Sequence, residues 1–196
     1  MSKAKQLWLL AGGNGAGKTT FYRTQLQPLG MPFVNADVLA KELFPEEMEQ
    51  RSYEAAKIAE QIRLQLLKDG RTFCFETVFS HPSKIDFAAQ AKALGYEVIL
   101  VFVHLENTDL NNARVSQRVE EGGHFVPSNK VSERVPRTLK HIKLALALCD
   151  RAYILDNSRF ENPFSQVAEL RGRELVVKRQ PLPDWAATLL EDYMNQ

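Results

Sequence analysis

The sequence has few of the features that mark a specialised class of protein. It holds two cysteines, Cys74 and Cys149, and each stands beside apolar residues, which favours buried reduced thiols over a disulfide or a metal pair. The formal net charge of +1 gives no overall attraction to nucleic acid or to a membrane surface. No apolar run approaches the ~20 residues that a membrane span needs, and the early run LWLLA is shorter than the core of a secretory signal. We therefore expect a cytoplasmic protein that does not bind membranes.

The remaining composition is that of a globular domain. Hydrophobic residues make up 44% of the chain and charged residues 25%, which is ordinary for such a domain. A length of 196 residues suits one domain with a sizeable core. We expect a single domain over residues 1–196, with a lid at about 114–137 and a C-terminal appendage at about 163–196.

Residues 12–19 read GGNGAGKT and fit the pattern G-x-x-x-x-G-K-[ST] of a phosphate-binding P-loop. In such a loop, backbone N–H groups surround the nucleotide phosphates, the lysine reaches the β- and γ-phosphates, and the hydroxyl binds Mg²⁺. An apolar run precedes the loop and a helical segment follows it, as the motif requires. The pattern predicts ATP or GTP as cofactor, with Thr19 as a ligand of Mg²⁺. The expected nucleotide-binding residues are Gly13, Asn14, Gly15, Ala16, Gly17, Lys18, Thr19 and Thr20.

Strand-like and helix-like segments alternate along the chain, which predicts an α/β fold with helices on both faces of a mainly parallel, five-stranded sheet. Apolar runs predict strands at 7–11, 32–36, 72–75, 96–103 and 152–155. Helical spacing predicts helices at about 48–68, 82–94, 108–119 and 128–148. Near the C-terminus the sequence predicts a small β-hairpin around residues 171–173 and a short helix at 185–193.

Polar residues follow two of the predicted strands: Asp37 follows the second, and Glu76 with Thr77 ends the third. Ligands of open parallel sheets bind beyond the carboxyl ends of the strands. Two carboxylates facing a γ-phosphate suit phosphoryl transfer to an alcohol, because one of them can take the proton of the acceptor hydroxyl. The alternative for Asp37 is a helix N-cap. The alternative for Glu76 is a structural role, in which its carboxylate caps the following turn. If Glu76 is functional, it either binds the acceptor or contacts the ligands of Mg²⁺ without binding the metal itself.

Arginines cluster on both sides of the glycine pair Gly122-Gly123. Arg114 and Arg118 share one face of a predicted helix, and Arg134 and Arg137 lie on the next helix. Phosphoryl-transfer enzymes need cations around the migrating group, on a segment that closes over it. We interpret this segment as a lid, with Arg118 its strongest member, and the alternative is a pair of solvated helix faces.

The histidines show no metal-ligand spacing, so Mg²⁺ is the one metal that we infer. His104 ends the central strand and is expected to be structural. His124, beside the double glycine, is the candidate for the site.

With these features the chain resembles the zeta toxin family of P-loop kinases, and within it the short bacterial relatives often labelled as ABC-type ATPases. The ABC label does not fit, because the chain has neither an L-S-G-G-Q signature nor an apolar run followed by Asp-Glu. The stretches that carry the resemblance are GGNGAGKTT (12–20), VNADVLAKEL (34–43), FETVFS (75–80), AKALGYEVILVFVHL (91–105), RVSQRVEEGGHFVP (114–127) and DNS (156–158).

The resemblance implies an adenylate-kinase-like core and ATP-dependent phosphorylation of a small molecule, with UDP-N-acetylglucosamine or a related UDP-sugar as first candidate. It implies that Lys18 holds the phosphates and that Asp37 is the base. It also implies that Glu76 and Thr77 bind the acceptor and that Arg118 stabilises the transition state. A small antitoxin protein is the partner that the family implies.

The sequence departs from the larger toxins in its lid. Those toxins have a second arginine shortly before the lid proline, whereas His124-Phe125-Val126 precede Pro127 in this chain. Arg134 or Arg114 would then supply the missing charge, or His124 would supply part of it. We therefore expect Arg134 to be catalytic, and Arg114 and His124 to bind the acceptor.

Two other functions are consistent with the sequence. One is a kinase for a nucleoside, a nucleotide or a nucleic-acid 5′-end, although the neutral charge and the lack of interleaved basic and aromatic residues argue against a polymer. The other is a nucleotide-dependent regulatory switch without an acceptor.

Overall fold

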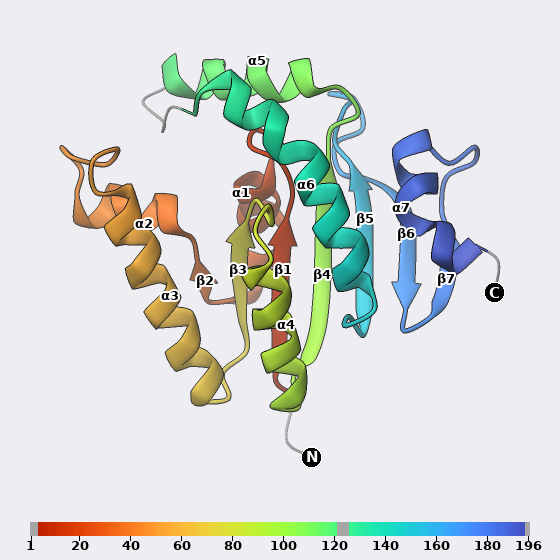
Figure 1. Ribbon diagram of the computed structural model, residues 1–196, viewed down its shortest axis with the longest axis horizontal. Helices are drawn as coiled ribbons and strands as arrows, with labels where there is room; N and C mark the ends of the chain where they lie inside the picture. The colour runs from red at the N-terminus through yellow and green to blue at the C-terminus, as the bar shows by residue number, and fades with distance from the viewer. Residues whose placement is uncertain (1–3, 121–125, 195–196) are drawn as a thin grey trace.

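The computed structural model describes residues 4–120 and 126–194, apart from the side chains of Arg118 and Glu120. Within these residues one sheet of seven strands runs in the order β2-β3-β1-β4-β5-β6-β7 (Figure 1). The strands are β1 (Gln6–Ala11), β2 (Phe33–Val34), β3 (Phe73–Thr77), β4 (Glu97–His104), β5 (Arg151–Asp156), β6 (Ser165–Arg171) and β7 (Glu174–Val177). The helices are α1 (Lys18–Phe21), which continues as the π-helix η1 (Tyr22–Leu26) and the 3₁₀-helix η2 (Gln27–Leu29), then α2 (Ala36–Leu43), α3 (Ser52–Lys68), α4 (Ser83–Ala93), α5 (Thr108–Glu120), α6 (Ser128–Leu146) and α7 (Asp184–Met194).

The predicted α/β class is confirmed. Strands β1 to β5 pair in parallel, and β6 and β7 add an antiparallel hairpin beyond β5. The hairpin was expected from the sequence, but its place as a continuation of the same sheet was not. Helix α3 begins at Ser52 rather than near Met48. The apolar spacing of that segment begins at Ala55, so the residues before Ser52 have no apolar face to bury and form turns instead.

Helices cover both faces of the sheet. In Figure 1, α4 and α6 lie in front of it and α1 lies behind. Side chains alternate along β4, so Leu100 joins the core under α4 and α6, whereas Val101 joins a second cluster with Leu26 behind the sheet. Both residues of β4 are at most 1% exposed. The continuous apolar run of β4 therefore reflects a strand buried on both faces, as the sequence predicted.

The C-terminal segment packs on the main core. Ala186, Leu189 and Leu190 of α7 belong to the same buried cluster as the residues of α4 and α6. The ring of Trp185 lies 4.4 Å from the ring of His104, centroid to centroid. Burial lowers the pKa of His104 to about 4, so its imidazole is neutral at physiological pH. Among the described residues, no helix combines the length and apolarity that crossing a bilayer requires.

This packing allows a test of the prediction that residues 1–196 form a single domain. Replacement Leu190→Ala should lower the free energy of unfolding by about 2–5 kcal/mol, because it opens a cavity in the shared core. Urea unfolding followed by circular dichroism would measure the loss, and it should show one transition. The matched control is Met194→Ala in the same helix, where half of the side chain is exposed. An unchanged stability, or a second transition, would show that residues 163–196 form a separate unit.

Candidate functional site

The P-loop connects β1 to α1 at the carboxyl ends of the parallel strands, at the top of the sheet in Figure 1. Two of its glycines are required by the backbone. Gly17 has a φ of 95°, and a Cβ there would lie 2.5 Å from the Asn157 side-chain nitrogen. At Gly12 a Cβ would lie 2.1 Å from the carbonyl oxygen of Val103. The glycines therefore allow both the left-handed turn and the close contact with neighbouring strands.

Two buried asparagines fix the carbonyl groups of the loop. Asn157 Nδ2 donates to the Ala16 oxygen at 2.8 Å, and Asn111 Nδ2 donates to the Asn14 oxygen at 2.6 Å. Asn157 Oδ1 also accepts from the N–H of Phe164 at 3.2 Å. Neither asparagine was assigned to the site from the sequence. The available signal was the position of Asn157 directly after β5, where polar residues of parallel sheets meet ligands.

Glu76 of β3 lies between the two functional side chains of α1. The Lys18 ammonium lies 3.8 Å from Glu76 Oε1 and donates to the carbonyl of Gly13 at 3.0 Å. The Thr19 hydroxyl donates to Glu76 Oε2 at 2.8 Å. Both charged side chains are less than 10% exposed. A buried carboxylate, an ammonium and a hydroxyl thus converge at the entrance to α1.

These groups fit a Mg²⁺ ion that is shared with a nucleotide. Thr19 and Glu76 supply two adjacent oxygens, and oxygen is the ligand type that Mg²⁺ prefers. The described part of the chain contains no cluster of three His, Cys, Asp or Glu side chains that could hold a metal. Mg²⁺ is usually bound by one or two protein oxygens, by phosphates and by water, so a small set of protein ligands is what such a site needs.

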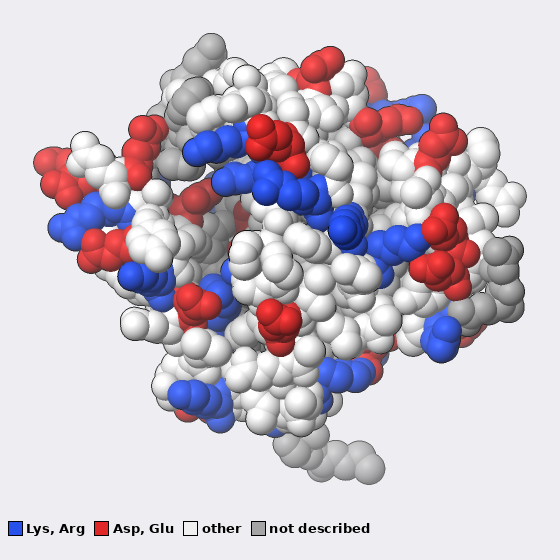
Figure 2. Space-filling view, viewed as in Figure 1, with Lys and Arg blue, Asp and Glu red and all other residues white. Residues whose placement is uncertain are grey.

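Two cavities meet at Lys18 and Glu76, which line both of them. The first, here called the P-loop cavity, has a volume of about 570 Å³ and lies on the side of Arg114, Asn157 and Phe164. The second, here called the α3 cavity, has a volume of about 470 Å³ and is lined by residues of α2, α3, β3 and α6. Figure 2 shows a hollow beside the corner of α2 and α3, with both basic and acidic side chains around it.

Asp37 lines the α3 cavity from the first turn of α2 and is exposed. The N-cap of this helix is Asn35, whose side-chain oxygen accepts from the N–H groups of Asp37 at 2.7 Å and Val38 at 3.2 Å. The alternative interpretation of Asp37 as the N-cap is therefore wrong. Among the described residues its carboxylate forms no hydrogen bond and no ion pair, so it is available to a ligand.

Thr77 lines the α3 cavity together with Asp37, and its predicted role in binding the acceptor stays a prediction. Its hydroxyl also accepts from the N–H of Phe79 at 3.0 Å, where the backbone has a positive φ of 64°. Thr77 thus shapes the turn that follows β3 as well as facing the cavity.

The arginines of the predicted lid divide between the two cavities. Arg134 of α6 lines the α3 cavity, and its Nη1 donates to Asn14 Oδ1 at 3.4 Å. Arg114 of α5, which was expected to bind the acceptor, lines the P-loop cavity instead and donates to the carbonyl of Asn157 at 3.0 Å. Arg137 is exposed and pairs with Glu133 on the surface of α6. The Arg118 side chain and His124 lie outside the described residues, so their roles stay predictions.

Arg63 and Lys84 also line the α3 cavity, and sequence reasoning missed both. Arg63 stands four residues after Ala59, a buried residue of the same helix, and is itself 6% exposed. An arginine in register with the apolar face of a helix was the available signal.

Comparison with known proteins supports this description. A family model described as an AAA domain matches residues 7–144. An uncharacterised protein of Haemophilus influenzae is 28% identical over 137 residues, which cover 66% of this chain and 97% of that relative. No function for this chain follows from that relative.

The fold is shared with solved structures. A chain of the AvrRxo1-ORF1:ORF2 complex with ATP aligns with a TM-score of 0.71 at 20% identity, over 98% of this chain and 64% of that chain. This chain thus spans less than two thirds of that relative's length. A chain of the PezAT toxin–antitoxin system of Streptococcus pneumoniae aligns with a TM-score of 0.65 at 16% identity, over 100% of this chain and 87% of that chain. The predicted resemblance to zeta-toxin-like P-loop kinases is confirmed as a likeness of fold.

The asparagine contacts predict that the P-loop loses affinity for nucleotide when the side chain of Asn157 is removed. Replacement Asn157→Ala leaves the Ala16 carbonyl without its donor, and we expect the Kd for ATP to rise about tenfold. Isothermal titration calorimetry would measure it, with Asn162→Ala as control, because Asn162 is exposed in the loop before β6. Equal affinity of Asn157→Ala and the parent protein would show that the loop holds its shape without this contact.

Proposed function

The chain belongs to the AAA domain family, and from this premise we propose that it is an ATP-dependent kinase that transfers the γ-phosphoryl group to a hydroxyl of a small molecule. The observation that carries the proposal is the meeting of the two cavities at Lys18 and Glu76. A nucleotide in the P-loop cavity and an alcohol in the α3 cavity would bring their reacting atoms together there. Holding two reactants in such an arrangement supplies much of the rate enhancement of phosphoryl transfer.

The P-loop cavity suits ATP. Backbone N–H groups of the loop and the Lys18 ammonium would bind the phosphates. Phe164 and the largely exposed Phe160 line this cavity and offer apolar rings to a base. Arg114 lies on the same side, so we assign it to the nucleotide rather than to the acceptor.

Asp37 is the proposed general base. Its carboxylate lines the α3 cavity and has no hydrogen-bond or ion-pair partner within the described residues, so it can accept the proton of the acceptor hydroxyl as the oxygen attacks the γ-phosphorus. Arg134 reaches the same cavity from α6 and would stabilise the negative charge of the transferred group. Arg118 of the predicted lid has the same proposed role.

Thr19 and Glu76 would hold Mg²⁺ together with phosphate oxygens of the nucleotide. When bound, Mg²⁺ supplies positive charge that neutralises the phosphate oxygens. We assign Glu76 to the metal rather than to the acceptor, because its carboxylate already contacts the Thr19 hydroxyl.

The acceptor and the partner follow from the resemblance. A UDP-sugar such as UDP-N-acetylglucosamine is the first candidate acceptor, and the cytoplasm, where such compounds and ATP occur together, is the proposed location. The PezAT relative is described as a toxin–antitoxin system and AvrRxo1-ORF1 as a complex with ORF2. We therefore include an antitoxin-like protein partner in the proposal.

The kinase proposal predicts that Asp37→Asn lowers turnover about 10²- to 10⁴-fold, the range for loss of a general base, while the Kd for ATP changes less than about twofold. The assay incubates the protein with labelled ATP, Mg²⁺ and a pool of UDP-sugars and nucleosides. Mass spectrometry then detects the product that has gained one phosphoryl group and identifies the acceptor.

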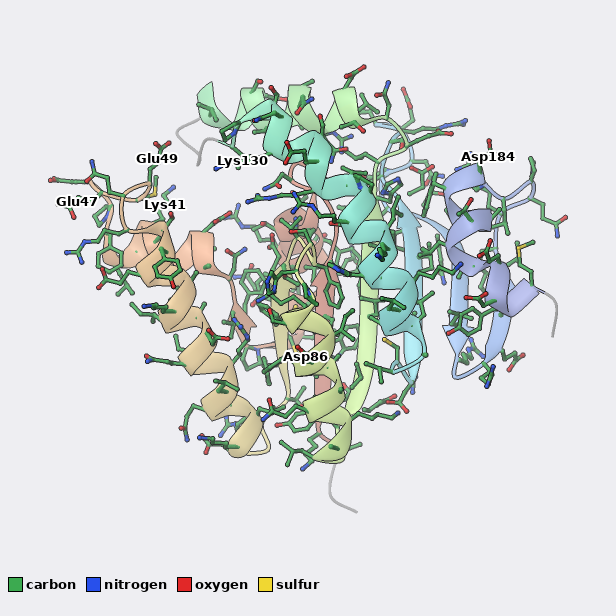
Figure 3. The ribbon with its side chains drawn as sticks, in the orientation of Figure 1. Lys41, Glu47, Glu49, Asp86, Lys130 and Asp184 are labelled. Atoms are coloured by element: carbon green, nitrogen blue, oxygen red, sulfur yellow. The ribbon has the colours of Figure 1, made fainter. Side chains whose placement is uncertain are left out.

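The matched control for this variant is Asp86→Asn. Asp86 also lies in the first turn of a helix, α4, but outside both cavities (Figure 3). It should keep full turnover. Equal turnover of Asp37→Asn and the parent protein would remove the proposed base. A parent protein that binds ATP but modifies no acceptor would favour the regulatory switch.

A second variant tests the metal site. In the parent protein Mg²⁺ should lower the Kd for ATP. In Glu76→Gln we expect the factor by which Mg²⁺ lowers this Kd to be about ten times smaller, because the carboxylate charge is lost. Calorimetric titration of ATP with and without Mg²⁺ measures this difference. Thr19→Ser keeps the hydroxyl and should behave like the parent. An unchanged Mg²⁺ effect in Glu76→Gln would place the metal elsewhere.

A further inference from the structure

Arg63 is a buried cation whose hydrogen-bonding groups are not all used. Its guanidinium carbon lies 4.5 Å from the centre of the Phe75 ring and 5.3 Å from that of Phe87, so the two rings hold it in the wall of the α3 cavity. Nη2 donates to Glu60 at 3.1 Å, but the Glu60 side chain is 56% exposed. Arg63 Nε is buried and has no hydrogen-bond partner among the described residues. A buried charge with a free donor is costly unless something else binds it.

A second cation faces the same part of the cavity. Lys84 of α4 is half-buried, lies 5.7 Å from the centre of the Phe75 ring and lines the α3 cavity with Arg63. Among the described residues no carboxylate lies within 4 Å of its ammonium. Burial lowers the pKa of both Arg63 and Lys84, and the charge of Arg63 lowers that of Lys84 further. Glu60 is the carboxylate whose charge raises the pKa of both Arg63 and Lys84. Its single negative charge does not balance the two positive charges.

The other carboxylates of the cavity are placed differently. Glu76 contacts Lys18 and Thr19 at the junction of the cavities. Asp37 is exposed on α2 and, within the described residues, forms no hydrogen bond or ion pair with Arg63 or Lys84. The pair therefore presents an excess of positive charge to whatever enters the α3 cavity.

We propose that Arg63 and Lys84 form a binding site for an anionic group of the acceptor, a phosphate or a carboxylate. This inference deepens the proposed function and rests on it, because it takes the α3 cavity as the place of the acceptor. An oxyanion in the α3 cavity would face the Arg63 guanidinium and the Lys84 ammonium at once, and charge-assisted hydrogen bonds to such groups are the strong ones. The guanidinium already packs against the Phe75 and Phe87 rings, so little of its conformational freedom remains to be lost on binding.

The proposal narrows the class of substrate. The acceptor is an alcohol that also carries a phosphate or a carboxylate, with the hydroxyl toward Lys18 and Asp37 and the anion toward α3 and α4. Uncharged sugars and nucleosides lack the group that this pair would bind. They would leave the excess positive charge of Arg63 and Lys84 over Glu60 unbalanced.

The test measures anion binding without turnover. The full-length protein is first saturated with Mg²⁺ and a non-hydrolysable ATP analogue, which fills the P-loop so that it cannot bind the probe. Inorganic phosphate is then titrated calorimetrically, and malonate is titrated separately as the carboxylate probe. The parent protein should bind at least one of them saturably, and the stronger probe indicates which anion the acceptor carries.

Variants locate the binding. Lys84→Gln and Arg63→Gln should each raise the Kd of the preferred probe at least tenfold, and Lys84→Arg, which keeps the charge, should bind within about threefold of the parent. Lys57→Gln is the matched control, because Lys57 lines the same cavity but is exposed and lies over the Tyr53 ring. Lys41→Gln controls for net charge, since Lys41 lies on α2 outside the cavity (Figure 3). Both controls should bind within about twofold of the parent.

The outcomes separate this inference from the proposed function. Absence of saturable binding in the parent, or parental affinity in Lys84→Gln, overturns the inference. Should Arg63→Gln fail to fold, the Lys84→Gln and Lys84→Arg pair still decides it. Binding that depends on Lys84, in a protein that phosphorylates nothing, keeps the anion site and rejects the kinase. Turnover of uncharged alcohols that is unchanged in Lys84→Gln keeps the kinase and rejects the anion site.

Discussion

The contact of Glu76 with Lys18 and Thr19 is the interaction on which the arrangement of the site depends. The carboxylate lies 3.8 Å from the ammonium and 2.8 Å from the hydroxyl, and it is almost fully buried. It occupies that position because β3 pairs with β1 in parallel, with Glu76 in register with Leu10 just before the P-loop. The strand order therefore places a carboxylate against the residues that would bind phosphate and metal. It also makes the two cavities neighbours rather than separate pockets.

The parts of the fold and site that the sequence predicted are those with local causes. Glycines at fixed spacing define the P-loop because the backbone there requires φ values that other residues avoid. Apolar runs define the buried strands, and the rule that ligands lie beyond strand ends placed Asp37, Glu76 and Thr77 around one cavity. Neither the metal role nor the acceptor role of these residues follows from position alone, and both stay proposals.

The parts that were missed depend on contacts between distant segments. Asn157 bonds to Ala16 across 141 residues and Asn111 to Asn14 across 97, and no local pattern encodes such pairs. Arg114 lies on the predicted helix, but the packing of α5 decides that it lines the P-loop cavity, and no sequence pattern encodes that side. The sequence predicted the hairpin as part of a C-terminal appendage and not as part of the sheet, yet β6 pairs with β5 and so extends the sheet.

The charge of the chain illustrates why composition said little about its substrate. A net charge of +1 implies no field over the whole surface, yet the lining of the α3 cavity contains Lys18, Lys57, Arg63, Lys84 and Arg134 against three carboxylates.

A kinase that joins an anionic nucleotide to an anionic acceptor must bring two negative groups together. At short range in a partly desolvated cavity their repulsion is far larger than in water. In the proposed kinase, the cations that line the cavity would offset that repulsion where it arises, whereas the same charges spread over the surface would be screened by salt. The local excess of positive charge in the lining of the α3 cavity is therefore a better guide to the substrate than the balance over the whole chain.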